Sequence, residues 1–206
     1  MVIIDCSSNN GHIDFALVKP QVDKVIIRAT MGTGTADKNA PYYAQHCKDN
    51  GIPVSYYHFA YPDKKMGGTI VSDATSEANY FLQTIKPYPD PVDLIIDCEP
   101  KNAAGDDTDL TQSEYALWLQ TFLDVVEHTT GKKMVIYTYA DYLNRHLPIG
   151  HTFGNFPLWI ANYGKNIKCP PLPHGWLNYY MWQYSQSGSI NGISTPVDLS
   201  VLNKTL

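Results

Sequence analysis

Two carboxylates separated by a single residue follow the apolar run in LIIDCEP, residues 94–100. Alternate residues of an extended strand face the same side, so Asp97 and Glu99 are expected to point one way, with α-carbons about 7 Å apart. Cys98 is then expected to point the other way. Neighbouring carboxylates shift each other's pKa values, which is what acid–base chemistry requires. The pair is therefore a candidate catalytic site.

Two further acidic residues lie on other predicted strands. Asp5 ends the strand-like run VIID and precedes Cys6, and Asp198 lies in PVDLS. The carboxyl ends of barrel strands carry the chemistry of such folds, so we expect all four carboxylates at one rim. Each acid alone could instead cap a helix or a turn. Together they indicate function, because a fold tolerates crowded like charges mainly where shifted pKa values are needed.

Two chemistries use such a cluster: glycoside cleavage by a pair of carboxyl groups, and metal-assisted hydrolysis. Trp159, Tyr163, Trp182 and Tyr57 lie near predicted strand ends, where aromatic rings can stack on sugars, although each could equally pack in the core. The seven histidines show no H-E-x-x-H spacing and the four cysteines no C-x-x-C pair. The sequence thus favours a sugar cleft without a metal or another cofactor.

The elements that would position these residues alternate along the chain. Strand-like runs are expected at residues 2–7, 24–30, 52–60, 93–99, 133–140, 157–163, 179–185 and 193–199. Helices are expected at residues 13–22, 39–50, 73–86, 111–131 and 140–147, the fourth starting with the capping box T-Q-S-E and stopping at Gly131. Five strand–helix units followed by three strands predict an α/β barrel that lacks outer helices on one side.

Composition and charge limit the number of domains and the classes of binding partner that we expect. The 206 residues are 44% hydrophobic, which suffices for the core of one domain, and we expect residues 1–206 to form a single catalytic domain. A formal charge of -5 without a run of Lys or Arg argues against nucleic acid. No apolar run is long enough to span a membrane, and the N-terminus lacks the pattern of a signal peptide.

The order of motifs resembles one family, the muramidases of glycoside hydrolase family 25, or Chalaropsis-type lysozymes. The resemblance covers nearly the whole chain. It comprises IIDCS, IIRATMG, Tyr57 to Phe59, the pair Asp97 and Glu99, IYT at 136–138, WIANY, the WQY of residues 182–184, and the late Asp198. Arg28 and Met31 depart from the pattern, because the family usually has Lys and often Glu at these positions.

The resemblance implies a flattened, TIM-like (β/α)5(β)3 barrel. It also implies hydrolysis of the β-1,4 bond between N-acetylmuramic acid and N-acetylglucosamine in peptidoglycan. Glu99 then looks like the general acid/base. Asp97 looks like the group that holds the substrate's 2-acetamido group or stabilises positive charge at the anomeric carbon. Asp5 and Asp198 look like flanking acids.

Six residues are candidate substrate contacts. The resemblance suggests four of them, and the aromatic pattern adds two tryptophans: Arg28, Tyr57, Tyr137, Tyr163, Trp159 and Trp182. A silent peptidoglycan-binding module on the same scaffold is the main alternative, and a metal-dependent polysaccharide deacetylase is a third. We expect a monomer that is made in the cytoplasm and acts on cell-wall glycan strands after release, by phage lysis or non-classical export.

Overall fold

The computed structural model describes residues 2–64, 68–101, 108–164 and 169–203. The strands in these ranges are β1 (Ile3–Cys6), β2 (Lys24–Met31), β3 (Thr35–Ala36), β4 (Val54–Phe59), β5 (Leu94–Cys98), β6 (Val135–Tyr139), β7 (Leu158–Ala161), β8 (Met181–Gly188) and β9 (Val197–Leu202). The α-helices are α1 (Phe15–Val18), α2 (Ala40–Asp49), α3 (Ile70–Ile85), α4 (Gln112–Thr130) and α5 (Ala140–His146). Short 3₁₀ turns span Ser8–Asn10, Lys19–Gln21 and Phe153–Asn155.

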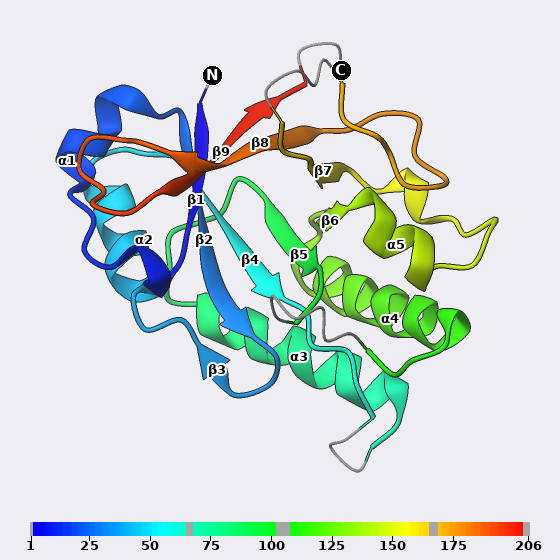
Figure 1. Ribbon diagram of the computed structural model, residues 1–206. Coiled ribbons are helices and arrows are strands. Elements are labelled where there is room, and N and C mark those ends of the chain that lie inside the picture. The colour runs from blue at the N-terminus through cyan, green and yellow to red at the C-terminus, as the bar shows by residue number, and fades with distance from the viewer. Residues whose placement is uncertain (1, 65–67, 102–107, 165–168, 204–206) are drawn as a thin grey trace.

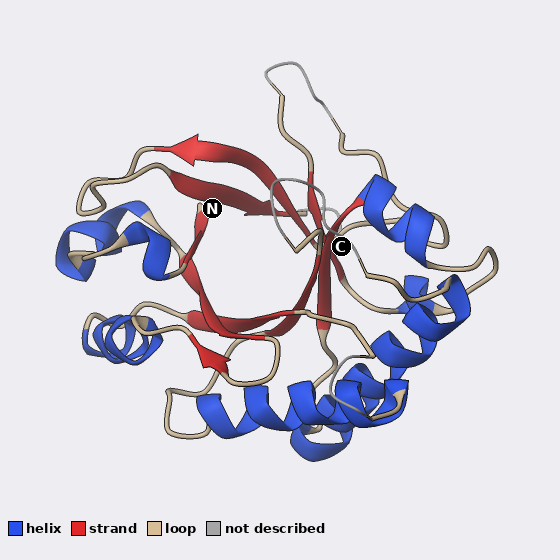
Figure 2. Cartoon of the chain, turned by 60° about the horizontal axis from the view of Figure 1, so that its bottom comes forward, coloured by secondary structure: helices blue, strands red, loops and turns tan. Residues whose placement is uncertain are grey.

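The strands form a closed ring with the helices outside it (Figures 1 and 2). The order is β1-β9-β8-β7-β6-β5-β4-β2, and the pairing of β1 with β2 closes the barrel, while β3 extends β2 at the edge. Five strand–helix units precede β7, β8 and β9, which no α-helix follows in the described part of the chain. The predicted (β/α)5(β)3 barrel is therefore confirmed.

Local signals set the helix ends. At the start of α4 the Thr111 side chain accepts from the Glu114 backbone N–H, and the Glu114 carboxylate accepts from the Thr111 backbone N–H. Gly131 ends the helix with a positive φ of 69°. α3 begins earlier than the predicted residue 73, because Thr69 and Ser72 form a reciprocal cap.

The last strand runs against the others. β9 is antiparallel to β1 and β8, whereas the pairs from β2 to β8 along the ring, and β1 with β2, are parallel. The start of β9 therefore lies at the rim where the parallel strands end. Asp198, the second residue of β9, pairs in register with Asp5 of β1. The sequence placed this strand at residues 193–199, four residues too early at its start.

Strand alternation separates two apolar clusters. One fills the barrel interior with residues that include Ile3 and Ile95, and a larger one lies between the barrel and its helices. Cys6 and Cys98 belong to the outer cluster and are buried. The prediction that these cysteines face away from Asp5 and Asp97 is confirmed.

A buried ion pair occupies the opposite end of the barrel from the acidic rim. Lys24 Nζ lies 2.6 Å from Asp93 Oδ2, and both side chains are largely shielded from solvent. Ser55 and Tyr180 donate further hydrogen bonds to the same carboxylate. The charge of Lys24 is thereby compensated inside the protein. None of the helices described is both long and apolar enough to cross a membrane.

Candidate active site

Four carboxyl groups meet at the rim of the barrel. Asp5 and Asp97 are buried, with exposed fractions of 8% and 5%, while Glu99 directly follows β5 and Asp198 starts β9, both half-buried. Burial raises the pKa values of Asp5, Glu99 and Asp198, and the charge of Asp198 raises those of Asp5 and Glu99 further. The structure thus brings together the four acids selected from the sequence.

Asp97 is the acid with a free oxygen. Burial, and next the charges of Glu99 and Asp5, raise its pKa well above the usual value, and Arg28 opposes this effect. Its Oδ1 atom is buried without a hydrogen-bond partner among the residues described. A buried polar atom without a partner costs free energy, so this oxygen is available to an incoming donor.

Glu99 holds a proton to higher pH than an ordinary glutamate. Burial, followed by the charge of Asp198, raises its pKa to about 7. A carboxyl group with such a pKa can give up a proton in neutral or mildly acidic solution and take it back afterwards. Glu99 therefore has the properties of a general acid/base.

Asp5 is held by an amide. The Gln183 Nε2 atom donates to Asp5 Oδ2 over 2.8 Å, and this bond lowers the pKa of Asp5. Burial and Asp198 act more strongly in the other direction, so the pKa of Asp5 stays well above its usual value. Burial also raises the pKa of Asp198, and its contact with Asp5 lowers it. The sequence analysis did not select Gln183, although it lies in the WQY motif.

Arg28 is fixed by a second residue that the sequence analysis missed. Its guanidinium contacts Asp37 Oδ2 through Nε at 3.0 Å and Nη2 at 2.9 Å. Asp37 also accepts hydrogen bonds from the backbone N–H groups of Ser8 and Asn39. Arg28 keeps part of its surface exposed and acts electrostatically on Asp97. Asp37 therefore orients a positive charge that acts on the acidic rim.

The three candidate tyrosines line the inner side of the barrel. Tyr57 is half-buried, and burial and next the charge of Asp97 raise its pKa well above the usual value. The hydroxyls of Tyr137 and Tyr163 donate to Gln183 Oε1 at 2.7 and 2.6 Å. Both hydroxyls are thus engaged within the protein, which the sequence did not indicate.

The two candidate tryptophans lie on different sides of the barrel wall. Trp159 is 2% exposed in the interior and donates from Nε1 to Ser200 Oγ. Trp182 packs against the outer cluster and donates to the Asn162 carbonyl, on the face of β8 opposite to Gln183. Their positions differ from the expected open stacking surface: Trp159 supports the floor, and Trp182 supports the wall from outside.

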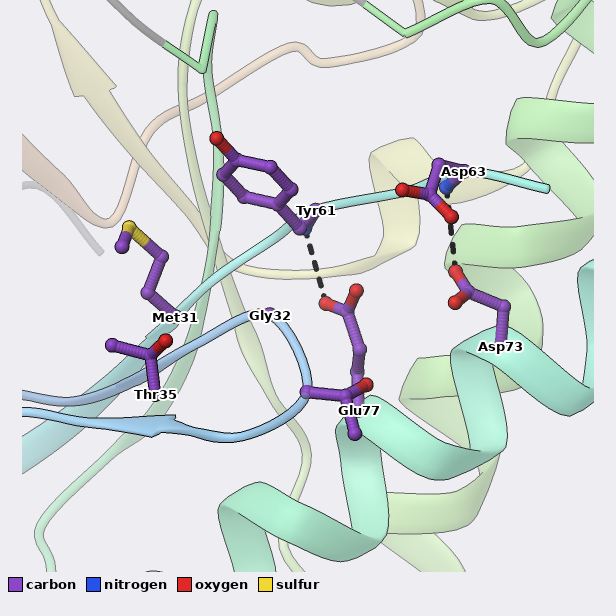
Figure 3. Close-up of a pocket in the computed structure, with 8 residues that line it drawn as sticks. Met31, Gly32, Thr35, Tyr61, Asp63, Asp73 and Glu77 are labelled. Atoms are coloured by element: carbon purple, nitrogen blue, oxygen red, sulfur yellow. Dashed lines mark hydrogen bonds between the residues drawn. The ribbon is translucent and has the colours of Figure 1, made fainter. Parts of the chain in front are cut away.

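A hollow of about 330 Å³ opens beside the rim, at the end of β2 (Figure 3). Met31 lies on one side of it, and α3 carries Asp73 and Glu77 on the other. Glu77 accepts from the Tyr61 backbone at 3.0 Å, and Asp73 accepts from the Asp63 backbone at 3.3 Å. These carboxylates hold the backbone at Tyr61 and Asp63, just after β4. No three His, Cys, Asp or Glu side chains are arranged to hold a metal ion in the part of the chain described.

The rim has what glycosidic bond cleavage requires. One carboxyl group, Glu99, has a pKa raised to about 7, so that its acid and base forms are both present near neutral pH, and a second, Asp97, offers a buried oxygen. Cleavage needs protonation of the departing oxygen and stabilisation of positive charge at the anomeric carbon. The two acids can supply these two effects separately.

Comparisons with known proteins agree with this chemistry. The model of the family described as Glycosyl hydrolases family 25 matches residues 4–193, a range that includes Asp5, Asp97 and Glu99 and ends before Asp198. An autolytic lysozyme of Clostridium acetobutylicum is 32% identical over 199 residues, which are 95% of this chain and 54% of that protein. The chain thus spans about half the length of that relative.

Solved structures share the fold across nearly the whole chain. A bacterial lysozyme from Streptomyces coelicolor is 27% identical with a TM-score of 0.82, and the match covers 98% of this chain and 92% of that one. The spore cortex lytic enzyme SleM of Clostridium perfringens is 26% identical with a TM-score of 0.83, covering 98% of this chain and 67% of that one.

Proposed function

The chain belongs to glycosyl hydrolases family 25, and from this we propose that it is a peptidoglycan hydrolase of the N-acetylmuramidase, or lysozyme, type. It would cleave the β-1,4 bond between N-acetylmuramic acid and N-acetylglucosamine. The kinship with an autolytic lysozyme and with a bacterial lysozyme structure supports this substrate class. We further propose that residues 1–206 act as one catalytic domain and as a monomer.

One observation carries the proposal: Asp97 has a buried oxygen without a partner, and it feels the charge of Glu99, whose own pKa burial and Asp198 raise to about 7. Glu99 donates its proton to the glycosidic oxygen, which leaves as a hydroxyl of the departing sugar, and then, as a base, takes a proton from the water that adds to the anomeric carbon. Asp97 Oδ1 accepts from the 2-acetamido N–H of the muramic acid residue or stabilises the charge on its ring. Either contact would provide the partner that Asp97 Oδ1 lacks.

The flanking groups tune and position this pair. Burial and then Asp198 raise the pKa of Glu99, which keeps its acid form available, while Arg28 favours the ionised form of Asp97. Arg28 and Tyr57, which keep some exposed surface, are proposed to contact the glycan directly. Tyr137, Tyr163 and Trp159 are proposed to support the floor beneath it, because their polar groups are already engaged.

A wall digest tests the activity. Purified peptidoglycan is incubated with the protein, and the new reducing ends are identified by mass spectrometry. Reducing-end muramic acid supports the proposal. Reducing-end glucosamine would indicate a glucosaminidase, free peptide an amidase, and released acetate with loss of activity in EDTA a deacetylase. Binding to walls without cleavage would indicate a silent module.

Substitution of each acid tests the two roles. The glycosidic oxygen of a sugar leaving group must be protonated as the bond breaks. An activated aryl leaving group, whose phenol has a low pKa, departs without that help. Glu99→Ala should therefore nearly abolish wall hydrolysis and spare much of the bond cleavage in an activated aryl glycoside. Asp97→Ala should depress both reactions. Circular dichroism verifies each fold, and selective rescue of Asp97→Ala instead of Glu99→Ala would show that the roles are reversed.

The site of action follows from the substrate. We propose that the protein acts on cell-wall glycan strands after release from the cytoplasm, through phage lysis or non-classical export. Detection of the protein in wall fractions only after lysis of the producing cell would support this route. Secretion from intact cells with removal of an N-terminal segment would contradict it.

A further inference from the structure

Gln183 links the carboxylates to a group of tyrosines. Its side chain is 2% exposed in the barrel interior. Its Oε1 atom accepts from the Tyr137 hydroxyl at 2.7 Å and from the Tyr163 hydroxyl at 2.6 Å, and its Nε2 atom donates to Asp5 Oδ2 at 2.8 Å. Both ends of the amide are therefore engaged, by phenols on one side and by a carboxylate on the other.

The phenols fix which end of the amide faces Asp5. A flipped amide would present its oxygen to the Asp5 carboxylate, and two acceptors would face each other in a buried site. The flip would also deprive the Tyr137 and Tyr163 hydroxyls of their acceptor. Tyr139 is hydrogen-bonded to Tyr163 and not to the Gln183 amide, because its hydroxyl contacts the Tyr163 hydroxyl at 3.1 Å.

We propose that Gln183 is a positioning residue that Tyr137 and Tyr163 orient so that its amide opposes the binding of a proton to Asp5 within the carboxylate cluster. A donor N–H favours the ionised form of a carboxyl group. The proton that the crowded acids retain is then left to the other members of the cluster, Glu99 among them. The catalytic consequence rests on the proposed function, whereas the effect on Asp5 does not.

The charges around Asp5 make this assignment necessary. Burial and the neighbouring acids all favour a proton on Asp5, and the Gln183 amide opposes them. The titratable and charged groups that act on Asp5, or on which it acts, come from five strands: Cys6 of β1, Asp198 of β9, Asp97 and Glu99 at the end of β5, Tyr57 of β4 and, through Asp97 and Tyr57, Arg28 of β2. Without the amide, Asp5 would hold a proton to still higher pH.

The direct test follows Asp5 in the free protein. Carboxyl carbons of aspartate are labelled with ¹³C, the Asp5 signal is assigned with Asp5→Asn, and its titration is recorded by NMR. In Gln183→Met, which keeps the length but has no N–H, the proton affinity of Asp5 should rise about tenfold or more, since a hydrogen bond to a charged group is lost. Tyr137→Phe combined with Tyr163→Phe should act in the same direction.

A matched control removes a hydroxyl that does not touch the amide. Tyr139→Phe should leave the Asp5 titration unchanged. An unchanged Asp5 titration in folded Gln183→Met would overturn the proposal. If Gln183→Met does not fold, the variant that combines Tyr137→Phe with Tyr163→Phe is the test. An Asp5 titration in that variant equal to that of the wild type would overturn the proposal.

Activity gives a second readout. The acid limb of the pH profile of kcat/KM on soluble glycan fragments should move to higher pH in Gln183→Met, whereas a purely structural defect would lower activity equally at every pH. An equal loss at every pH, without movement of the limb, would contradict the proposal. If the Asp5 titration shifts but the wild-type protein cleaves no glycan, the proposed function fails and the role of Gln183 stands.

Discussion

Replacement of Glu99 by glutamine should stabilise the fold at neutral pH while removing the proposed acid catalyst. Burial and the charge of Asp198 raise the Glu99 pKa from 4.5 to about 7. Between these values the folded protein keeps a proton that the unfolded chain has released, so stability falls as pH rises through this window. Glutamine has the same shape and no charge, and it avoids this loss.

The magnitude follows from the two pKa values. The difference between 4.5 and about 7 corresponds to roughly 3 kcal/mol at about 1.4 kcal/mol for each pKa unit. Glu99→Gln should therefore raise the free energy of unfolding by roughly 3 kcal/mol at pH 7.5 and hardly change it at pH 4. For a chain of this size the gain at pH 7.5 corresponds to about 6–12 °C in Tm.

Urea denaturation followed by tryptophan fluorescence at pH 4, 5.5 and 7.5 measures the effect. Glu114→Gln is a control of opposite sign, because hydrogen bonds from Lys64 and Thr111 lower the Glu114 pKa to about 2. Its loss should destabilise the protein at pH 7.5. If Glu99→Gln is no more stable than the wild type at pH 7.5, or gains equally at pH 4, the crowding of carboxyl groups is not the cause.

Three further outcomes are expected. The kcat/KM on soluble glycan fragments should decline above about pH 7 as Glu99 loses its proton, and equal activity from pH 4 to 8 would contradict this. A bulky thiol reagent should modify one thiol per native chain, at the exposed Cys169; fast reaction at the buried Cys98 would be inconsistent with the strand register. Lys24→Met should destabilise the fold by about 3–5 kcal/mol in urea denaturation, because Asp93 loses its buried partner, and Asp93→Asn added to it should recover part of the loss.

The sequence was sufficient for the features that depend on local signals. The capping box at Thr111 and the glycine at Gly131 defined α4, and strand alternation put Asp97 inside the barrel and Cys98 outside. These features need only the near neighbours of each residue. The order of strands and helices predicted the barrel, the strand ends selected the four acids, and the resemblance to the family then suggested a role for each acid.

Features that depend on distant neighbours were missed or differ. Asp37 and Gln183 are held by partners on other elements, and the residues next to them in the sequence do not predict these contacts. Trp182 and Gln183 alternate along β8, but only the register of the closed sheet decides which of them faces inward. The direction of β9, which brings Asp198 to the rim, is likewise a property of the whole sheet.

The pairing of β1 with β9 also governs when the protein can become active. Asp5 and Asp198 lie near opposite ends of the chain, so their contact has one of the longest loop closures that this fold contains. A nascent chain that has emerged only through β8 has neither a closed ring nor its fourth carboxylate. The rim with its four carboxyl groups therefore forms only after β9 is synthesised and docks against β1.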